Sequence, residues 1–314
     1  MKTRSIRYLP QGGLEVVTLE VGDPGPGQVQ VRGSACGICA WDLNTFRSGS
    51  RVTWAAPPGH EGLGRVVRVG AGVTGFQEGD RVAAGGFGGL ANVNASSTYH
   101  LPESDLEDVY WLVEPLACVV TGVDHCALKI GDRVAVVGCG FMGLLLVQCL
   151  AHSFAERLIA SDVSPERLAL ASQFGADGLL NPLEADVESK IAALRALEID
   201  TVVDASGSQA GFALTQRLVK RGGRINNFGW IHGEVTISGD AWHMNGYTVV
   251  NSSPAARLRD PFPASIRLLA ANMVDTKPLV THVVTLDEMG ALLSGVAAGQ
   301  EPGYIKGVVT LDGE

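Results

Sequence analysis

The sequence contains no dense block of lysine or arginine residues. It has 24 basic and 33 acidic residues, which give a formal net charge of −9 at pH 7 and a pI near 5.3. A chain with this balance lacks the basic surface that proteins use to neutralise nucleic-acid phosphates. Nucleic acid is therefore not expected as a partner, and the acidic composition is typical of a soluble enzyme.

Long apolar runs are also missing. No uninterrupted apolar stretch approaches the length needed to span a bilayer, and Met1–Arg4 leads into a strand-like segment instead of a signal peptide. We therefore expect no membrane partner and a cytoplasmic location. Hydrophobic residues make up 46% and charged residues 18% of the 314 residues. That composition predicts a globular protein with a large core, and the length fits two domains.

Cysteine is scarce, and its spacing excludes two common frameworks. The six cysteines are Cys36, Cys39, Cys118, Cys126, Cys139 and Cys149. Only the first two form a C-x-x-C pair, so no second pair completes a four-cysteine zinc knuckle. A disulfide framework is not expected in a cytosolic-looking chain of this size. At most one of these cysteines needs a chemical role.

A glycine-rich motif follows an apolar run near the middle of the chain. The run Val134–Val137 leads into Gly138-Cys139-Gly140-Phe141-Met142-Gly143, which has the G-x-G-x-x-G spacing of a dinucleotide-binding turn. In such a turn Gly138 permits the tight bend, Gly140 lets the backbone approach a pyrophosphate, and Gly143 lets the helix pack against the sheet. Amides at the start of the helix then face the phosphates.

The acidic partner of this motif is Asp162, which ends the apolar run Leu158–Ser161. A carboxylate at the tip of the second strand accepts hydrogen bonds from the adenosine ribose diol, and it repels a 2′-phosphate. Asp162 therefore favours NAD over NADP as the cofactor.

The pattern of elements divides the chain into two domains. Residues 1–120 contain many short candidate strands separated by glycine and proline turns, which predicts a β-rich, barrel-like domain. Over residues 121–264 strands alternate with helical stretches, which predicts an α/β fold with a doubly wound parallel sheet of the Rossmann type. Residues 265–314 are expected to return to the first domain.

Three segments of the first domain carry residue types that suit zinc: Cys39, His60 with Glu61, and Glu114. Zinc accepts a mixed set of thiolate, imidazole and carboxylate ligands, and a catalytic site keeps one position exchangeable. Each residue also has a structural alternative. Cys39 fits a core position, His60 a turn, and Glu114 a charge at a helix N-terminus.

Together these motifs resemble the medium-chain dehydrogenase/reductase family, and within it the zinc-dependent sorbitol and polyol dehydrogenase-like branch. The resemblance spans essentially the whole chain. It implies a GroES-like catalytic domain beside the Rossmann domain, and a homodimer or homotetramer. The motifs that carry it, besides the glycine-rich turn, are Cys36-Gly37-Ile38-Cys39-Ala40-Trp41-Asp42, Gly59-His60-Glu61-Gly62, Gly79-Asp80-Arg81-Val82 and Glu114-Pro115-Leu116-Ala117.

The resemblance also implies roles for individual residues. Cys39, His60 and Glu61 correspond to metal ligands, Glu114 to a fourth ligand that binds directly or through water, and Asp42 to a carboxylate that orients the histidine. Lys306 is similar in position to a basic residue that faces the pyrophosphate, although a solvated surface lysine is an equal alternative. The further cofactor contacts implied are Phe141, Met142, Val163, Arg167, Ala205, Ser206, Gly207, Phe228 and Gly229.

The sequence departs from the family pattern in three places. Many relatives have a four-cysteine lobe for a structural zinc after the Gly-Asp-Arg-Val turn, but Gly85–Leu90 runs on without cysteine, so we expect one zinc ion per chain. Trp41 stands where a serine or threonine often starts a proton relay, and Asn44 where a relay histidine is often found. A tryptophan has no proton to exchange at neutral pH, so Trp41 is expected to line the substrate pocket or to pack in the core.

These observations predict an NAD-dependent oxidation of a secondary alcohol, in a polyol, sugar or cyclitol-like substrate, with a proton path through Glu61 or Glu114. Two alternatives stay open: an enzyme for an amino-acid alcohol such as threonine, and a non-catalytic NAD-binding sensor on the same fold. A zinc-free quinone reductase has no use for this set of ligands. Candidate pocket walls are Trp41, Phe46, Trp54, Phe87, Trp230, His243 and Asn251–Pro254.

Overall fold

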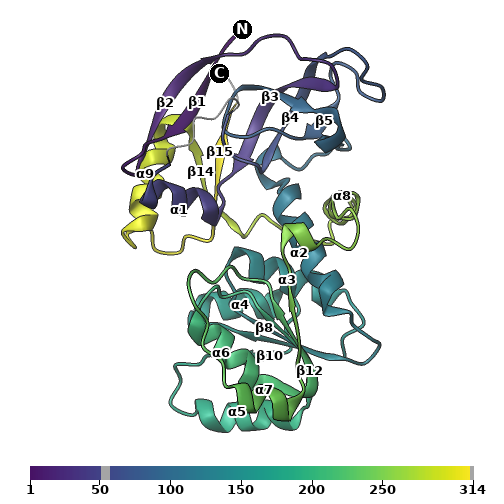
Figure 1. Cartoon of the computed structure of the whole chain (residues 1–314), viewed down its shortest axis with the longest axis vertical. Coiled ribbons are helices and arrows are strands. Elements are labelled where there is room, and N and C mark those ends of the chain that lie inside the picture. The colour runs from purple at the N-terminus through teal and green to yellow at the C-terminus, as the bar shows by residue number, and fades with distance from the viewer. Residues whose placement is uncertain (51–56, 312–314) are drawn as a thin grey trace. The chain divides into compact units, whose positions relative to one another are not determined.

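The computed structural model describes residues 1–50 and 57–311, and it divides into two compact units (Figure 1). Unit 1 comprises Met1–Glu114 and Asp275–Glu314, and unit 2 comprises Pro115–Val274. The boundaries expected from the sequence lay at residues 120 and 265. They differ because helices α2 (Val113–Cys126) and α8 (Phe262–Ala270) line one cavity within unit 2, where Val120 and Val123 face Ala264 and Leu268.

Unit 1 is the β-rich domain. Strands β1 (Lys2–Tyr8) and β2 (Leu14–Glu20) form an antiparallel hairpin. A separate seven-stranded sheet has the order β14-β15-β3-β4-β5-β7, with β6 also paired to β3. Its strands are β3 (Gln28–Gly37), β4 (Gly62–Val69), β5 (Arg81–Ala83), β6 (Leu90–Asn94), β7 (Tyr99–His100), β14 (Val280–Thr285) and β15 (Lys306–Thr310).

Helices α1 (Ala40–Ser48) and α9 (Leu286–Ala297) pack against this framework. The short 3-10 turn η1 (Ala95–Ser97) connects β6 to β7, and η2 (Asp108–Tyr110) follows β7. The core of the unit contains Ile6, Tyr8, Cys36, Phe87 and Met289, all at most 2% exposed. The central strand β3 ends at Gly37, so the chain passes through the buried Ile38 into Cys39 and α1. The last strand, β15, pairs with the same end of β3.

Unit 2 is a six-stranded, fully parallel sheet with the order β10-β9-β8-β11-β12-β13. The order reverses between β8 and β11, which is the place where doubly wound sheets bind dinucleotides. The strands are β8 (Arg133–Val137), β9 (Arg157–Ser161), β10 (Gly178–Leu180), β11 (Ile199–Asp204), β12 (Val219–Asn227) and β13 (Thr248–Asn251). The helices that connect them are α3 (Phe141–Ala151), α4 (Pro165–Gln173), α5 (Val187–Ala196), α6 (Gln209–Leu218) and α7 (Gly239–Asn245), with the 3-10 turn η3 (Pro254–Ala256) after β13.

The burial of β8 explains why its sequence is a continuous apolar run. Val134, Ala135 and Val136 are all 0% exposed, because helices cover both faces of the parallel sheet. The predicted α/β fold, with a Rossmann-type sheet and a β-rich domain, is thereby confirmed.

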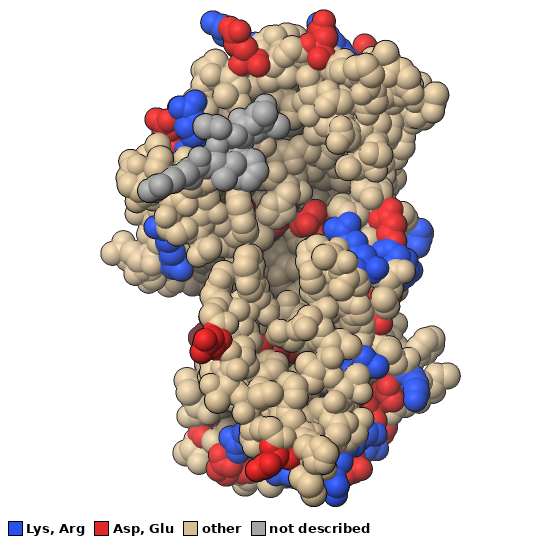
Figure 2. Space-filling view, in the orientation of Figure 1, with Lys and Arg blue, Asp and Glu red and all other residues tan. Residues whose placement is uncertain are grey.

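The surface mixes charges of both signs. Figure 2 shows lysine and arginine side chains lying among aspartate and glutamate side chains on the face in view. Lysine or arginine side chains of the described residues also form ion pairs with acidic side chains, as in Arg65 with Glu103 and Arg217 with Glu188. Over the described residues, no helix has both the length and the apolar character that a membrane crossing requires.

Candidate metal and cofactor sites

Cys39 lies at the junction of strand β3 and helix α1. It is the N-cap residue of α1, with extended backbone angles (φ −84°, ψ 157°), and its Sγ accepts a hydrogen bond of 3.5 Å from the Trp41 amide. Burial, and then the nearby Glu61 carboxylate, raise the pKa of the Cys39 thiol to about 12. The thiol therefore stays protonated unless a cation beside it stabilises the thiolate.

Asp42 holds this junction in place. Its carboxylate accepts hydrogen bonds from the Cys39 amide (2.7 Å) and from the Tyr8 hydroxyl (2.8 Å), and the side chain is fully buried. Asp42 also occupies the N3 position of the capping box whose N-cap is Cys39, so it fixes the backbone of that residue. The expectation that Asp42 orients the histidine ligand stays a prediction.

The side chains of Cys39, His60 and Glu61 converge in unit 1. One ligand atom from each, a thiol sulfur, an imidazole nitrogen and a carboxylate oxygen, lies within 4.8 Å of the other two. His60 is exposed, whereas Glu61 is 5% exposed. Metal–ligand bonds of about 2.0–2.3 Å can bridge such a group with small side-chain movements.

The chemistry of the three side chains tests whether a metal fits. The thiol sulfur, the imidazole nitrogen and the carboxylate oxygen form the mixed donor set that zinc accepts. The Glu61 carboxylate already faces one cation: its Oε1 accepts a hydrogen bond from Lys306 Nζ (2.8 Å), and its Oε2 lies 2.6 Å from the same ammonium. The donor set therefore fits zinc.

Gly37 makes room for that carboxylate. A Cβ at this position would lie 2.0 Å from Glu61 Oε2. We therefore expect Gly37→Ala to push Glu61 out of the cluster and to weaken zinc binding by about 10- to 100-fold, the effect typical of losing a group that supports a metal ligand. Zinc affinity measured by competition with a chelator checks this. Gly22→Ala, where no atom lies within 4 Å of the added Cβ, is the matched control, and equal affinities for both variants would contradict the assignment.

Lys306 lies at the metal cluster, and its expected contact with the pyrophosphate stays a prediction. Its Nζ donates to Glu61 Oε1 and to the Ile38 carbonyl, both at 2.8 Å, and the residue is 3% exposed. Burial by itself lowers the pKa of Lys306, but the Glu61 carboxylate more than offsets it and the pKa is raised. The group is therefore a buried ammonium. The surface-lysine alternative is wrong for the same reason.

Trp41 and Glu114 lie at the margins of the described cluster. The Trp41 ring meets His60 edge-on, with centroids 6.4 Å apart, and Tyr8 edge-on at 6.2 Å. Glu114 is half-buried in the first turn of α2, outside the group of three ligand atoms. Asn44 is exposed on α1. Of the other expected pocket walls, Phe87 is 0% exposed in the core, which rules it out as a wall, and Trp54 lies outside the described residues.

In unit 2 the glycine-rich turn has the form that dinucleotide binding requires. Gly138 has φ +96°, and a Cβ there would lie 2.6 Å from the Ser206 amide nitrogen. A Cβ on Gly143 would lie 1.8 Å from the Gly138 carbonyl oxygen. Gly140, in contrast, has no atom within 4 Å of its Cβ position and is the N-cap of α3 without a side-chain cap. The structure thus leaves open space beside the amides that begin α3 at Phe141 and Met142.

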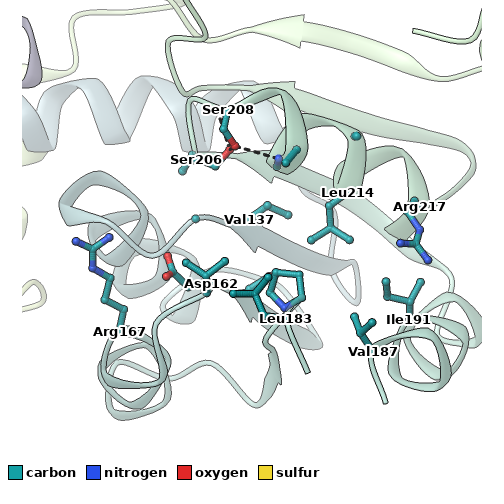
Figure 3. Close-up of a pocket in the computed structure, with 18 of the residues that line it drawn as sticks. Val137, Asp162, Arg167, Leu183, Val187, Ile191, Ser206, Ser208, Leu214 and Arg217 are labelled. Carbon is teal, nitrogen blue, oxygen red and sulfur yellow. Dashed lines mark hydrogen bonds between the residues drawn. The ribbon is translucent and has the colours of Figure 1, made fainter. Parts of the chain in front are cut away.

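A cavity of about 610 Å³ opens beside this turn (Figure 3). Asp162 and Arg167 lie at one end of it and Arg217 at the other, with Leu183 and Leu214 between them. The Asp162 carboxylate accepts hydrogen bonds from the amides of Cys139 (2.6 Å) and Ser164 (2.9 Å), so it is fixed against the turn. Of the cofactor contacts expected from the sequence, those lining this cavity are Gly138, Gly140, Asp162, Val163, Arg167, Ala205 and Ser206.

Two further expected segments lie side by side next to the cavity. A Cβ on Gly229 would lie 2.6 Å from the Gly207 amide nitrogen, and the amides of Phe228 and Gly229 both bond to the Asp204 carbonyl. The remaining expected contacts, Phe141, Met142 and Gly143, belong to the first turn of α3 and do not line the cavity.

The sequence analysis missed part of the cavity wall. Ser208, Leu214 and Arg217 come from α6 and its N-cap, and Val187 and Ile191 come from α5. Only Ser208 follows a strand end closely enough for the motif to have suggested it. Asp204, buried at the end of β11, was also missed. It accepts hydrogen bonds from the Ser206 amide and hydroxyl, and burial raises its pKa.

Comparison with known families identifies the class of the protein. The zinc-binding dehydrogenase model matches residues 142–271, and the alcohol dehydrogenase GroES-like domain model matches residues 25–107. The chain belongs to the zinc-dependent alcohol dehydrogenases of the medium-chain dehydrogenase/reductase family. It is an enzyme of that class, and its cofactors are zinc and a nicotinamide dinucleotide.

Individual relatives agree over nearly their full lengths. (R,R)-butanediol dehydrogenase from Bacillus subtilis is 27% identical, with 91% of this chain and 93% of the relative covered. Sorbitol dehydrogenase from Gallus gallus is 27% identical with 88% of each covered, and L-threonine 3-dehydrogenase from Pyrococcus abyssi is 28% identical with 90% of each covered. The crystal structure of the B. subtilis butanediol dehydrogenase superimposes with a TM-score of 0.85 at 25% identity, over 98% of this chain and 99% of that one.

Proposed function

We propose that this protein oxidises a secondary alcohol with NAD, and that the substrate is a polyol, sugar or cyclitol-like compound. One zinc ion per chain is held by Cys39, His60 and Glu61, with Glu114 as a further ligand, directly or through water. The observation that carries the proposal is the convergence of three different ligand atoms, a sulfur, a nitrogen and an oxygen, within 4.8 Å of one another. Relatives of this chain include dehydrogenases for butanediol and sorbitol, which are secondary alcohols.

The residues of the chain then divide the work of catalysis. When bound, zinc supplies a Lewis acid for the alcohol oxygen, and the nicotinamide accepts the hydride. Cys39, fixed by its cap and by Asp42, and His60 hold the metal at the end of β3. The Trp41 ring, edge-on to His60, shields one side of that imidazole from water.

The proton of the alcohol needs an acceptor other than the usual hydroxyl relay, since Trp41 has no proton to exchange. Glu61 is a poor candidate because its Oε1 is already bound to the Lys306 ammonium. We assign the proton to the carboxylate of Glu114, in the first turn of α2. Glu61 is thus proposed to bind the metal only, whereas Glu114 both binds it, directly or through water, and accepts the proton.

Asp162 is proposed to select NAD over NADP through the ribose diol. Asp162→Ser is expected to weaken NAD binding by about tenfold or more, because a hydrogen bond to a charged group contributes about 1.5–3 kcal/mol. The substitution is also expected to reduce the preference for NAD over NADP, because the carboxylate that repels the 2′-phosphate of NADP is gone. Fluorescence titration of both cofactors measures this, with the exposed Asp240→Ser of α7 as control. An unchanged ratio of the two affinities would count against Asp162 as the selector.

The substrate class is tested by following NADH formation with a panel of alcohols. Polyols, 2,3-butanediol, sugars and cyclitols are expected to reduce NAD, whereas simple primary alcohols are not. L-threonine belongs in the panel because a threonine dehydrogenase is among the relatives. Turnover of threonine alone would replace the polyol proposal, and no turnover of any compound by a chain that binds both cofactors would favour the non-catalytic sensor.

We further propose a cytoplasmic homodimer or homotetramer. All six cysteines lie within the described residues and are free thiols, which fits a reducing compartment. Strand β13 ends the sheet of unit 2, and Trp230 and Met244 of the same unit are 67% and 66% exposed. An open strand edge with exposed apolar side chains favours pairing with a second copy. Sedimentation of the purified chain tests this, and a monomer at micromolar concentration would contradict it.

A further inference from the structure

The buried ammonium of Lys306 has no role in the proposed chemistry. Lys306 is the first residue of β15, and the pairing of β15 with β3 brings it beside Ile38 and Glu61. Its Nζ lies 2.8 Å from Glu61 Oε1, 2.6 Å from Glu61 Oε2 and 2.8 Å from the Ile38 carbonyl. The two side chains are 4% and 2% exposed. The ammonium therefore faces both oxygens of one candidate zinc ligand.

Because this ion pair is buried, it matters for the stability of the fold. Breaking a buried pair by removing one partner is strongly destabilising, because it leaves an uncompensated charge in the interior. In the metal-free chain Lys306 is the cation that faces the Glu61 carboxylate, with its Nζ within 2.8 Å of both carboxylate oxygens. When a dication enters the cluster, it takes over part of that compensation. The Glu61 carboxylate then faces two cations, the metal and the Lys306 ammonium, and these two cations repel each other.

Removing the ammonium makes the cluster one charge more negative both with and without the metal. The metal-free state loses the partner of Glu61, whereas the loaded state loses a charge that repelled the metal. Both effects act in the same direction and favour the loaded state. Weaker zinc binding after removal of the ammonium would instead mean that Lys306 orients the Glu61 carboxylate toward the metal.

We propose that Lys306 is a positioning residue that balances Glu61 in the metal-free chain and keeps zinc exchangeable in the Cys39, His60 and Glu61 cluster. When the metal is absent, the Lys306 ammonium pairs with the Glu61 carboxylate. When the metal is present, the ammonium competes with the metal for that carboxylate. This inference rests on the proposed zinc site. It adds that Lys306 lowers the zinc affinity of the site below the affinity that Cys39, His60 and Glu61 would give without the ammonium.

The test compares the full-length wild type with Lys306→Met and Lys306→Gln, each loaded with zinc. The rate of zinc release to a chromogenic chelator is expected to fall by at least about tenfold in both variants, since charges a few ångströms apart interact strongly even at an effective dielectric of about 20. Stripped of metal, both variants are expected to unfold at a lower temperature than stripped wild type. Zinc is then expected to raise their unfolding temperature more than it raises that of wild type.

Lys220→Met is the matched control. Lys220 also pairs with a carboxylate, that of Asp200, but in unit 2 and away from the cluster. Its removal is expected to leave zinc release unchanged and to lower the unfolding temperature equally with and without zinc. A merely structural role of Lys306 would give this same pattern.

The outcomes separate the inference from the proposed function. If wild type binds no zinc, the proposed site itself is wrong. If wild type binds zinc but release from the Lys306 variants is unchanged or faster, the competition between Lys306 and the metal is wrong while the site stands. If Lys306→Met does not fold even with zinc, zinc release from Lys306→Gln decides whether the inference holds. The glutamine amide can still donate a hydrogen bond to Glu61, but it carries no charge. The cobalt(II) absorption of each variant reports whether Cys39 remains a ligand.

Discussion

Cys39→Ser is expected to lower zinc-dependent oxidation of a secondary alcohol by about a thousandfold, and to lower zinc bound per chain in parallel. The Lewis acid effect of a catalytic metal is worth several kcal/mol, and each 1.4 kcal/mol or so is a factor of about ten in rate. The fold is expected to survive, because Cys39 is an N-cap and serine is among the preferred N-cap residues. Elemental analysis together with the NADH rate measures both effects.

Cys36→Ser is the control for this prediction. Cys36 shares the C-x-x-C pair but is 0% exposed in the core, where its thiol contacts the Gly37 carbonyl at 3.6 Å. A serine hydroxyl can donate to the same carbonyl, so zinc content and activity are expected to stay near those of wild type. Loss of zinc from Cys36→Ser and retention by Cys39→Ser would reverse the assignment of the ligand.

Gly143→Ala is expected to have the second largest effect, a loss of cofactor affinity of about a hundredfold or more with clear destabilisation. Two opposite effects compete at this position. Alanine improves helix propensity by about 1 kcal/mol, but its Cβ would lie 1.8 Å from the carbonyl oxygen of Gly138. That atom belongs to the backbone of the turn, so the turn must open, and overpacking of this kind costs about 3 kcal/mol. A displacement of about 1 Å in a binding site is enough for a hundredfold loss.

Gly140→Ala tests the contribution of the glycine-rich turn to NAD binding separately from its contribution to the stability of the fold. No atom lies within 4 Å of the added Cβ, and the backbone (φ −68°, ψ −173°) suits alanine. Its unfolding temperature is therefore expected to stay near that of wild type while NAD affinity falls, because the methyl group stands where the pyrophosphate approaches. Thermal unfolding and NAD titration of both variants check the pair. Equal destabilisation by both substitutions would contradict this description of the turn.

The sequence predicted the elements whose signals are local. The β8 run, the glycine-rich turn and Asp162 form one continuous strand-turn-helix-strand unit, and the structure shows that unit as expected. The division into two units was also predictable, because the spacing of apolar runs changes along the chain. The short strand β10 and the helix α5 were not predicted, and the N-cap of α5, Asp186, makes no side-chain capping hydrogen bond. Helix α7 was missed although Ser238 caps its start and Gly246 its end.

The contacts of Asp42 with Tyr8 and of Lys306 with Glu61 could not be predicted, because both join distant segments of the chain. The Asp42 partner Tyr8 comes from β1, and Glu61 is 245 positions from Lys306 in the sequence. Only the pairing of β15 with β3 brings Lys306 to the metal cluster. The wall of the cofactor cavity from α5 and α6 was missed for the same reason, since it depends on how these helices pack over the sheet.

The most direct test of the central claim is a zinc titration of the metal-free chain in which NADH formation from a secondary alcohol is followed beside the zinc bound. The account predicts that activity is absent in the stripped protein and rises in proportion to zinc until one ion is bound per chain. Full activity in the zinc-free protein, or zinc binding that leaves the rate unchanged, would contradict a catalytic metal on Cys39, His60 and Glu61.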